Sequence, residues 1–408
     1  MFGEWTRRQT LAHFGVAAAG FTGFMPKQSR AQARPLRIGV MDDMTGPYAA
    51  NAGPGVVTAA KMAIDDFGGK VLGREVEVLQ ANDQNKIEVG VVTARNWYEN
   101  NDVSAIFGIS SSSVALGVQE VSRELKKPLI VTSAASTELS GKACSEMAVQ
   151  WNNDVYSSAS VIGNAALDQG LDTWFFVTVD YNFGAALETS LARIVRDRGG
   201  KILGSIKHPF GTSDFSSFLT QAQASGAKII ALANGGDDMN NAIKSAKEFG
   251  ILDSDQKVAT FYLQAPNIES VGQDLAAGLL NPTSFVPGLN EESREFCLRF
   301  NKLSGQYPTH IHAGYYTAVR HYLKAVAQAD TDETAAVIRA MRSLDVRDFM
   351  TAKGKIREDG RVMRDMYLVK IKPKAKMTFR FDYFEVIKTV PPELAFLSIQ
   401  EGGCPLAR

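Results

Sequence analysis

The sequence predicts an α/β protein built from two doubly wound parallel-sheet units. Short apolar runs alternate along the chain with longer runs whose apolar residues recur at helical spacing. This alternation begins at Leu36 and starts again after Trp151. Repeated strand and helix at this spacing is typical of parallel strands joined by crossover helices. The 408 residues, of which 45% are hydrophobic, are enough for two cores of ordinary size.

The first unit lies before Trp151. Its predicted strands are residues 36–41, 75–80, 103–108 and 128–132. Its predicted helices are residues 56–67, 89–98 and 114–125. In the first of these helices, Val56, Ala60 and Ile64 share one face, which is the pattern of a helix that covers a sheet.

The second unit repeats the pattern. Its predicted strands are residues 173–178, 201–206, 228–233 and 258–263, and its predicted helices are residues 155–167, 183–198, 215–224 and 240–249. Two further helices, 291–304 and 312–328, precede a β-like end at 363–371 and 382–386. This end has too few strands for a third domain. We therefore expect it to complete the two units, so that the chain crosses between them more than once.

The N-terminus has the pattern of an export signal. Arg7 and Arg8 precede an uncharged apolar run, and Ala31-Gln32-Ala33 forms a small-x-small cleavage site. The run is shorter than the roughly 20 strongly apolar residues of a membrane-spanning helix. We expect cleavage after Ala33 and a periplasmic product. The paired arginines resemble the twin-arginine export motif, which we favour, although a general secretory signal can also carry two arginines.

Charge and cysteine content narrow the class of protein further. The 44 basic and 44 acidic residues balance. No basic block is present, so we expect no nucleic-acid partner. In an oxidising compartment the three cysteines can form at most one internal disulfide. We expect Cys144 to pair with Cys404, because both follow glycine-containing loop stretches, whereas Cys297 lies in a helix-like run.

Candidate binding residues lie in the loops that follow the predicted strands. Ligands of open parallel sheets bind beyond the carboxyl ends of the strands, where loops lead into helices. The loops concerned are residues 42–52, 110–113, 132–138, 180–183 and 234–239. The second consists of four consecutive serines. At a helix start, such serines can cap backbone N–H groups or can hold a carboxylate or phosphate. The residues alone leave both interpretations open.

Catalytic and cofactor motifs are absent from the sequence. The segment from Gly108 to Ser112 lacks the closing glycine of a nucleophile elbow, and the pair Gly53 and Gly55 lies too far from the preceding strand for a dinucleotide loop. There is no Walker loop and no zinc motif. His310 and His312, two positions apart at a helix start, indicate surface or capping histidines. We expect no enzyme, no cofactor and no metal site.

Four segments in order resemble one family. They are L-R-I-G-V-M-D-D-M-T-G-P-Y-A, F-G-I-S-S-S-S-V, L-I-V-T-S-A-A-S-T-E-L and D-Y-N-F-G. Together they resemble the periplasmic solute-binding proteins of branched-chain amino acid (leucine/isoleucine/valine) ABC importers. The resemblance implies a type I periplasmic-binding-protein fold with two lobes joined by a three-strand hinge. It places residues 34–153 plus 284–350 in lobe 1, 154–283 plus 351–395 in lobe 2, and 396–408 in a C-terminal tail.

The resemblance also assigns a carboxylate-binding end of the site. In the family, a serine after the third strand and a small-small-Ser/Thr segment after the fourth hold the α-carboxylate of the ligand. These roles fall here on Ser111, with Ser112 adjacent, and on Ala134, Ala135 and Ser136. Several such donors can hold a carboxylate through charge-assisted hydrogen bonds without a buried arginine.

The other end of the site departs from the family pattern. Phe183 replaces a tyrosine, which keeps the wall and loses the hydroxyl. Asp237 appears where the family has tyrosines, and Gln264 lies where the acidic partner of the α-ammonium group is expected. An aromatic residue that the family has in the first loop maps near Asn51 or Ala52 of this chain, and its loss suggests a roomier pocket. A buried ammonium group without its counter-charge costs several kcal/mol, so the missing acid is the more important change.

Two classes of ligand remain open at this point. Either Asp237 takes over the ammonium group and the ligand is an amino acid, or the ligand is an acid without an α-amine. In the second case an aromatic or aliphatic body would stack on aromatic side chains such as Trp151, Tyr156, Tyr181 or Phe183. Plain core packing is the alternative explanation for these aromatic residues.

The resemblance implies a non-enzymatic function. We expect a monomeric extracytoplasmic protein that closes over a small carboxylate-bearing ligand and delivers it to an ABC permease and its ATPase subunits at the inner membrane. An exported sensor that presents its bound state to a membrane receptor is the alternative that the sequence leaves open.

Overall fold

The structure is a computed structural model that describes residues 34–406. The expected export signal, with its cleavage after Ala33, lies outside the described residues, as do residues 407 and 408 of the expected tail. No helix in the described part of the chain is long and apolar enough to cross a membrane.

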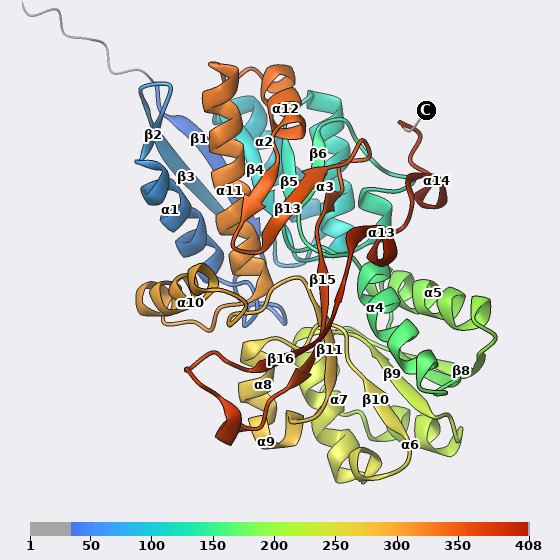
Figure 1. Cartoon of the computed structure of the whole chain (residues 1–408). Coiled ribbons are helices and arrows are strands. Elements are labelled where there is room, and N and C mark those ends of the chain that lie inside the picture. Colours follow the sequence, from blue (N-terminus) through green and yellow to red (C-terminus); the bar gives the residue numbers. More distant parts are fainter. Residues whose placement is uncertain (1–33, 407–408) are drawn as a thin grey trace, which may run out of the picture. The chain divides into compact units, whose positions relative to one another are not determined.

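Lobe 1 is built on a six-stranded sheet in the order β2-β3-β1-β4-β5-β6 (Figure 1). Its strands are β1 (Leu36–Asp42), β2 (Lys70–Val71), β3 (Arg74–Asn82), β4 (Val103–Gly108), β5 (Leu129–Val131) and β6 (Ala148–Gln150). All pairings are parallel except that of the short edge strand β2. The predicted parallel sheet is confirmed, with two additional short strands, β2 and β6, that the sequence pattern did not indicate.

Helices cover both faces of this sheet, as the doubly wound prediction requires. The helices are α1 (Gly55–Phe67) and α11 (His310–Ala329) on one face, and α2 (Ile87–Asn100) and α3 (Ser112–Leu125) on the other. Strand β1 is buried on both of its faces. On one face, Ile38 and Val40 are fully buried in the same hydrophobic core as the apolar residues of α1. Gly39 faces the other way, and a Cβ atom there would collide with the Trp97 ring of α2.

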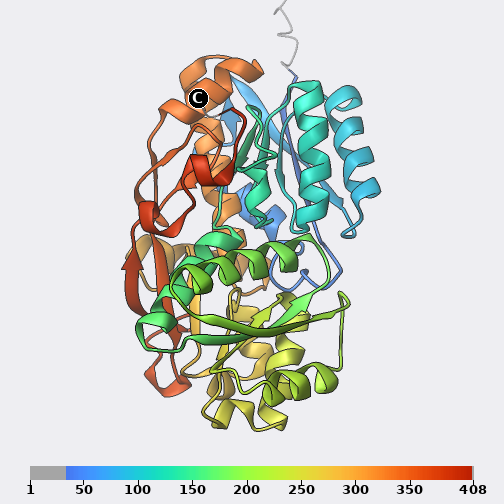
Figure 2. The ribbon, with the colours of Figure 1, turned by 90° about the vertical axis from the view of Figure 1, so that its right-hand side faces the viewer.

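Lobe 2 contains a four-stranded parallel sheet in the order β10-β9-β7-β8. Its strands are β7 (Thr173–Val179), β8 (Lys201–His208), β9 (Ile229–Ala233) and β10 (Lys257–Ala259). Its helices are α4 (Val155–Asp168), α5 (Asn182–Asp197), α6 (Ser216–Ala224), α7 (Gly236–Glu248), α8 (Ala265–Val271) and α9 (Gln273–Ala276). Figure 2 shows α4 and α5 (green) beside each other.

Two boundaries in lobe 2 differ from the prediction. Strand β10 ends at Ala259, because the chain turns into α8, where Gln264 forms a capping box with Asn267 and Pro266 occupies the first turn. Helix α7 begins at Gly236, four positions before the predicted start at residue 240. Its first turn holds two aspartates, which the positive end of the helix dipole stabilises.

The C-terminal part of the chain is divided between the lobes. A three-stranded antiparallel sheet of β11 (Leu280–Thr283), β15 (Met366–Ile371) and β16 (Phe384–Val390) packs against α4 in lobe 2. The remaining elements are α10 (Glu291–Ser304), α12 (Thr334–Ser343), β12 (Val346–Asp348), β13 (Thr351–Ile356), β14 (Val362–Met363), α13 (Pro392–Ala395) and α14 (Ile399–Gly402).

We propose a different position for one expected lobe boundary. Residues 351–363 were expected in lobe 2, but β13 packs against α12, and Arg361 forms a parallel bridge with Gln150 at the end of β6. Backbone pairing thus attaches this segment to lobe 1. We therefore propose lobe 1 as residues 34–153 plus 284–363, with the chain crossing between lobes at 151–154, 284–290 and 364–365.

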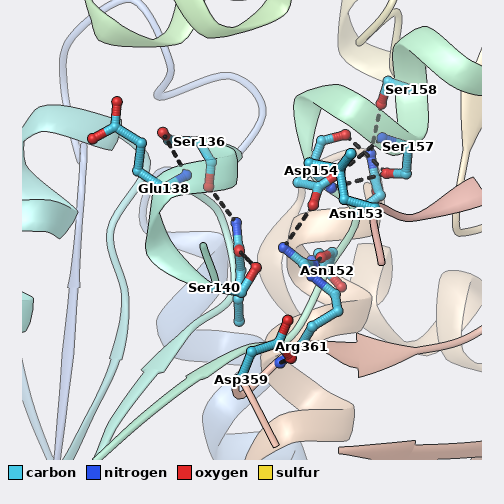
Figure 3. A network of polar contacts seen from close by, with 12 residues as sticks. Ser136, Glu138, Ser140, Asn152, Asn153, Asp154, Ser157, Ser158, Asp359 and Arg361 are labelled. Carbon is cyan, nitrogen blue, oxygen red and sulfur yellow. Dashed lines mark hydrogen bonds and ion pairs between the residues drawn. The ribbon is translucent and has the colours of Figure 1, made fainter. Parts of the chain in front are cut away.

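A buried ion pair fastens the first crossing (Figure 3). Asp154 caps α4 by accepting from the Ser157 N–H at 2.8 Å, and its other oxygen lies 3.1 Å from a guanidinium nitrogen of Arg361. Arg361 also donates to the carbonyl oxygen of Asn152. The guanidinium is 1% exposed, and burial lowers the pKa of Arg361 while the nearby carboxylates of Asp154 and Asp359 oppose that change. A lobe 1 cation is thereby paired with the first helix of lobe 2.

The expected disulfide between Cys144 and Cys404 is confirmed. It joins the loop before β6 to the segment after α14, across 260 positions of sequence. Cys297 is a free thiol buried in α10, and burial raises the pKa of that thiol. The C-terminal segment is therefore held covalently to lobe 1.

Replacing Cys144 and Cys404 together by serine should lower the free energy of unfolding by about 2 to 5 kcal/mol, because the unfolded chain loses a long cross-link. Urea denaturation with and without a reductant measures this loss. The reductant should destabilise the wild-type protein and leave the double variant unchanged. A thiol titration of the denatured, unreduced protein that counts three free cysteines would contradict the pairing.

Candidate ligand-binding site

A small cavity of about 50 Å³ lies between the two lobes. It is lined by Tyr48, Asn51, Ser110, Ser133, Ala135, Tyr181, Phe183, Gly236, Tyr262, His310 and Ile311. A larger hollow of about 780 Å³ lies on lobe 1 beside α1, α10 and α11. Asp66, one of the four acidic residues that line it, is already paired with Arg299 at 2.6 Å and with the Tyr316 hydroxyl at 2.7 Å. The cavity between the lobes is therefore the better candidate for a ligand site.

Most of the lining residues follow the carboxyl ends of parallel strands. Ser110 lies between β4 and α3, Ser133 and Ala135 follow β5, Tyr181 precedes α5, and Gly236 begins α7. His310 begins α11 on the lobe 1 side. The N-termini of four helices thus meet at one cavity. Because a helix N-terminus carries partial positive charge and free N–H groups, this arrangement favours an anionic ligand group.

Aromatic rings from both lobes form the wall of the cavity. Tyr181 and Phe183 stack with ring centroids 5.9 Å apart, and Phe183 meets Tyr262 at 5.4 Å. The ring centroids of Tyr48 and Phe210 are 5.4 Å apart, and the Tyr48 hydroxyl contacts the Tyr181 hydroxyl across the cleft. Burial raises the pKa of both of these phenols, which therefore stay neutral. These aromatic rings form an uncharged part of the wall that bridges the two lobes.

Asp43 fixes the loop that carries Tyr48. Its carboxylate accepts hydrogen bonds from the backbone N–H groups of Thr45 and Tyr48, at 3.2 and 2.9 Å, and from the Asn85 amide at 2.7 Å. The family's first-loop aromatic maps near Asn51 or Ala52, where this chain has none, but Tyr48 of the same loop lines the cavity. The loop therefore places a ring in the cleft instead of leaving a roomier pocket.

Asp42 lies buried beneath the serine-bearing loops. It accepts hydrogen bonds from the Ser133 hydroxyl at 2.8 Å and the Tyr315 hydroxyl at 2.9 Å. Burial raises the pKa of Asp42, and the nearby hydroxyls of Ser110, Ser133 and Tyr315 oppose the change. The Ser110 hydroxyl is close enough to act on the charge of Asp42, but it does not have the geometry of a hydrogen bond to it. Because the hydroxyl proton of Ser133 is committed to Asp42, that oxygen offers only lone pairs to a ligand.

Of the four consecutive serines, Ser110 lines the cavity, one position before the expected Ser111. Ser111 is the N-cap of α3 without a side-chain capping bond, and Ser112 is fully buried. Ile109 causes the shift, because its φ of 70° turns the backbone just before the serines. Its N–H donates to the Met41 carbonyl at 2.8 Å and its carbonyl accepts from the Ala134 N–H at 2.7 Å, which hold this strained conformation.

Within the second expected segment, only Ala135 lines the cavity. The Ala134 N–H is committed to the Ile109 carbonyl. Ser136 is buried, and its hydroxyl accepts from the Glu138 N–H at 3.3 Å as the cap of a short helical turn. The structure thus assigns Ala134 and Ser136 to support of the loop.

Three other expected residues lie away from the cavity wall. Trp151 is fully buried in the core and donates its indole N–H to the Thr317 hydroxyl at 2.9 Å. Asp237 is exposed on α7. Gln264 caps α8, and its side-chain oxygen accepts from the His310 N–H at 3.3 Å. Core packing, helix capping and a contact between lobes explain these positions.

His310 and His312 were expected at the surface or in a cap, and both are buried. His312 belongs to a capping box with Thr309, and its Nε2 lies 2.8 Å from the Ala52 carbonyl. His310 lines the cavity instead. Burial lowers the pKa of His310 to about 3 and that of His312 to about 4, so both rings are neutral. Spacing alone could not separate a capping histidine from one that faces a cleft.

No residue of the cavity wall carries a formal charge at neutral pH. Asp238 of lobe 2 is 2% exposed and raises the pKa of Tyr48 and Tyr181 through its charge. Burial raises the pKa of Asp238 itself to about 6. Among residues 34–406, no cluster of His, Cys, Asp and Glu could hold a metal ion. The wall therefore offers hydroxyls, an amide, an imidazole and rings.

Residues 35–376 match the family model described as periplasmic binding protein. A Leu/Ile/Val-binding protein homologue of Brucella abortus is 23% identical over 341 residues, which are 81% of this chain and 86% of that protein.

Two solved structures are similar over almost their whole length. A periplasmic binding protein of Burkholderia mallei has a TM-score of 0.89 and 38% identity, covering 92% of this chain and 99% of that one. A branched-chain amino acid ABC transporter ligand-binding protein of Burkholderia xenovorans has a TM-score of 0.83 and 34% identity, covering 91% and 100%. Both agree with the expected two-lobed fold.

Asp83, which follows β3 near Asp42, gives a pH-dependent prediction. Burial, together with the charges of Asp42 and Asp43, raises the pKa of Asp83 from 3.8 to about 7. The folded protein therefore holds a proton that the unfolded chain releases above pH 4, and stability falls as pH rises from 4 through 7. Asp83→Asn should stabilise the protein at pH 8 by about 1 to 3 kcal/mol and by nothing at pH 4.

Thermal unfolding of both proteins between pH 4 and 8 measures this difference. The exposed Asp255, changed to Asn, serves as the control, because its stability difference from the wild type should not vary with pH. An equal effect of Asp83→Asn at pH 4 and pH 8 would count against a raised pKa.

Proposed function

This chain belongs to the periplasmic binding protein family, and we propose that it is the extracytoplasmic solute-binding component of an ABC importer. The family consists of binding proteins and not of enzymes, in agreement with the lack of catalytic motifs. The name of the Burkholderia xenovorans relative, an ABC transporter ligand-binding protein, supports transport. The partners in this proposal are a permease and its ATPase subunits at the inner membrane, and the described chain acts as a monomer in the periplasm after removal of residues 1–33.

We propose that the ligand is a small carboxylic acid without an α-amine. The observation that carries this choice is the uncharged wall of the cavity, which contains no aspartate or glutamate. An amino acid would bring its ammonium group into a closed cleft where no carboxylate lines the wall, and an unpaired buried cation costs several kcal/mol. An acid without the amine avoids that cost and gains the field of the converging helix N-termini.

The proposed orientation follows from the polar groups at each place in the cavity. The carboxylate lies at the start of α3, where the Ser110 hydroxyl is buried without a hydrogen-bond partner among residues 34–406. Ser111 and Ser112 contribute through their backbone N–H groups in the first turn of α3, and Ala135 lies beside them. The apolar body of the ligand stacks on the Tyr181 and Phe183 rings.

The size of the cavity indicates that the lobes must separate for a ligand to enter. A volume of about 50 Å³ is far below the roughly 300 to 1,000 Å³ of small-molecule sites. The Tyr48–Tyr181 and Gln264–His310 contacts join the lobes across the cleft and would break on opening. The three crossings then act as the hinge, and the ligand is trapped when the lobes close again. The closed form is the one that docks on the permease.

Ligand-stripped protein should be stabilised by simple carboxylic acids and not by the corresponding amino acids. The sharpest comparison is between matched pairs, such as 4-methylpentanoate against leucine, with benzoate and phenylacetate added for the aromatic wall. At about 100 times its Kd, a ligand stabilises the folded state by about 2.7 kcal/mol, which a thermal-shift assay detects readily. Stabilisation by leucine or another branched-chain amino acid alone would refute an amine-free ligand.

Ser110→Ala should weaken binding of the acid about tenfold to a hundredfold, because a hydrogen bond to a charged group is lost. Ser111→Ala should change the affinity by less than about threefold, since Ser111 acts through its backbone. Titration calorimetry of the two variants with the same acid measures both values. A larger loss of affinity in Ser111→Ala than in Ser110→Ala would contradict this assignment and would indicate that the Ser111 hydroxyl binds the carboxylate, as the sequence resemblance suggested.

A further inference from the structure

The polar side chains of the cavity wall fall into two groups. Tyr48 and Tyr181 bond to each other, Tyr262 receives a hydrogen bond from Ser158 at 3.2 Å, and Ser133 donates to Asp42. These groups are already satisfied. Three buried polar atoms of the wall have no hydrogen-bond partner among the described residues, namely Ser110 Oγ, Asn51 Oδ1 and His310 Nδ1.

Asn51 and His310 belong together, although they are distant in sequence. The hydroxyl of Thr309, the residue before His310, donates to the Asn51 carbonyl at 2.8 Å, which ties the first loop to the start of α11. Asn51 is 5% exposed and His310 is 3% exposed. A buried polar atom without a partner costs about 1 to 3 kcal/mol. Two such atoms on adjoining parts of one cavity indicate a place for a polar ligand group.

The chemistry of the pair favours a neutral group that both donates and accepts. The amide oxygen of Asn51 can only accept a hydrogen bond. His310 is a neutral imidazole, because burial lowers its pKa to about 3, and a neutral ring with its proton on Nδ1 can donate. No lysine or arginine lines the cavity to balance a second negative charge. A hydroxyl that donates to Asn51 and accepts from His310 satisfies both atoms at once.

We propose that Asn51 and His310 form a hydroxyl-binding subsite, so that the preferred ligand is a carboxylic acid that also carries a hydroxyl group. This inference rests on the proposed function, since the carboxylate occupies the Ser110 end of the same cavity. The two anchors fix the ligand at both ends, and the aromatic rings hold its body between them. Asn51 and His310 are thus specificity-determining residues of the site.

The test compares hydroxylated acids with their parent acid. Titration calorimetry measures the binding of benzoate and of 2-, 3- and 4-hydroxybenzoate to the ligand-stripped wild-type protein. At least one hydroxylated acid should bind about tenfold or more tightly than benzoate, because it satisfies two buried polar atoms that the parent leaves unpaired. In His310→Phe and in Asn51→Leu the ratio of the two affinities should fall to about twofold or less.

A measurement on the wild-type protein guards against variants that do not fold. Protein with 15N-labelled histidine should show a change in the His310 ring nitrogen resonances when the preferred hydroxylated acid is added, and a smaller change with benzoate. Binding of benzoate without any hydroxyl preference, or a preference that survives both substitutions, would overturn the subsite and leave the proposed function intact. Failure of every acid to bind the wild-type protein would overturn both.

Discussion

The parallel direction of the strands is the constraint on which the rest of the structure depends. In each lobe, every parallel strand ends at the same edge of its sheet, and the chain then turns into a helix. The two edges face one cleft, so loops from distant parts of the sequence, such as those before α3, α5 and α7, line one cavity. Their helix N-termini supply partial positive charge without any basic side chain. An uncharged wall can therefore still favour an anion.

Two strained or costly features maintain this arrangement. Ile109 adopts a left-handed conformation that β-branched residues rarely take, and hydrogen bonds from the neighbouring strands hold it there. Arg361 is buried against Asp154 at the first crossing, where removal of either partner would leave an unpaired charge. The first feature aims Ser110 into the cleft. The ion pair between Arg361 and Asp154 fastens the start of α4 to lobe 1. In the proposed opening of the lobes, this first crossing would therefore stay in place while lobe 2 rotates about it.

The polar groups of the cleft divide by whether the protein itself satisfies them. Asp42 and Asp43, an acidic pair in the sequence, have structural partners, and they hold Ser133 and the Tyr48 loop in place. Ser110, Asn51 and His310 have none among the described residues. Buried polar atoms are nearly always hydrogen-bonded in folded proteins. The atoms that lack a partner therefore say more about the polar groups of the ligand than the mere presence of polar residues in the wall. In our proposal they receive one carboxylate and one hydroxyl of the ligand.

The sequence by itself determined the two parallel-sheet units, the loops that hold the site, the partner of Cys144 and the absence of catalytic motifs. These follow from local periodicity, from turn residues and from the rule that ligands bind at the carboxyl ends of strands. Only the tertiary structure decided which residues in those loops face the cleft. Ser110 lines the cleft instead of the expected Ser111 because of the positive φ angle of Ile109. Trp151 lies in the core, where Thr317, 166 positions away in the sequence, accepts a hydrogen bond from its indole N–H. His310 and Asn51 became neighbours through Thr309. Such contacts join segments that are far apart in the chain, and no local pattern encodes them.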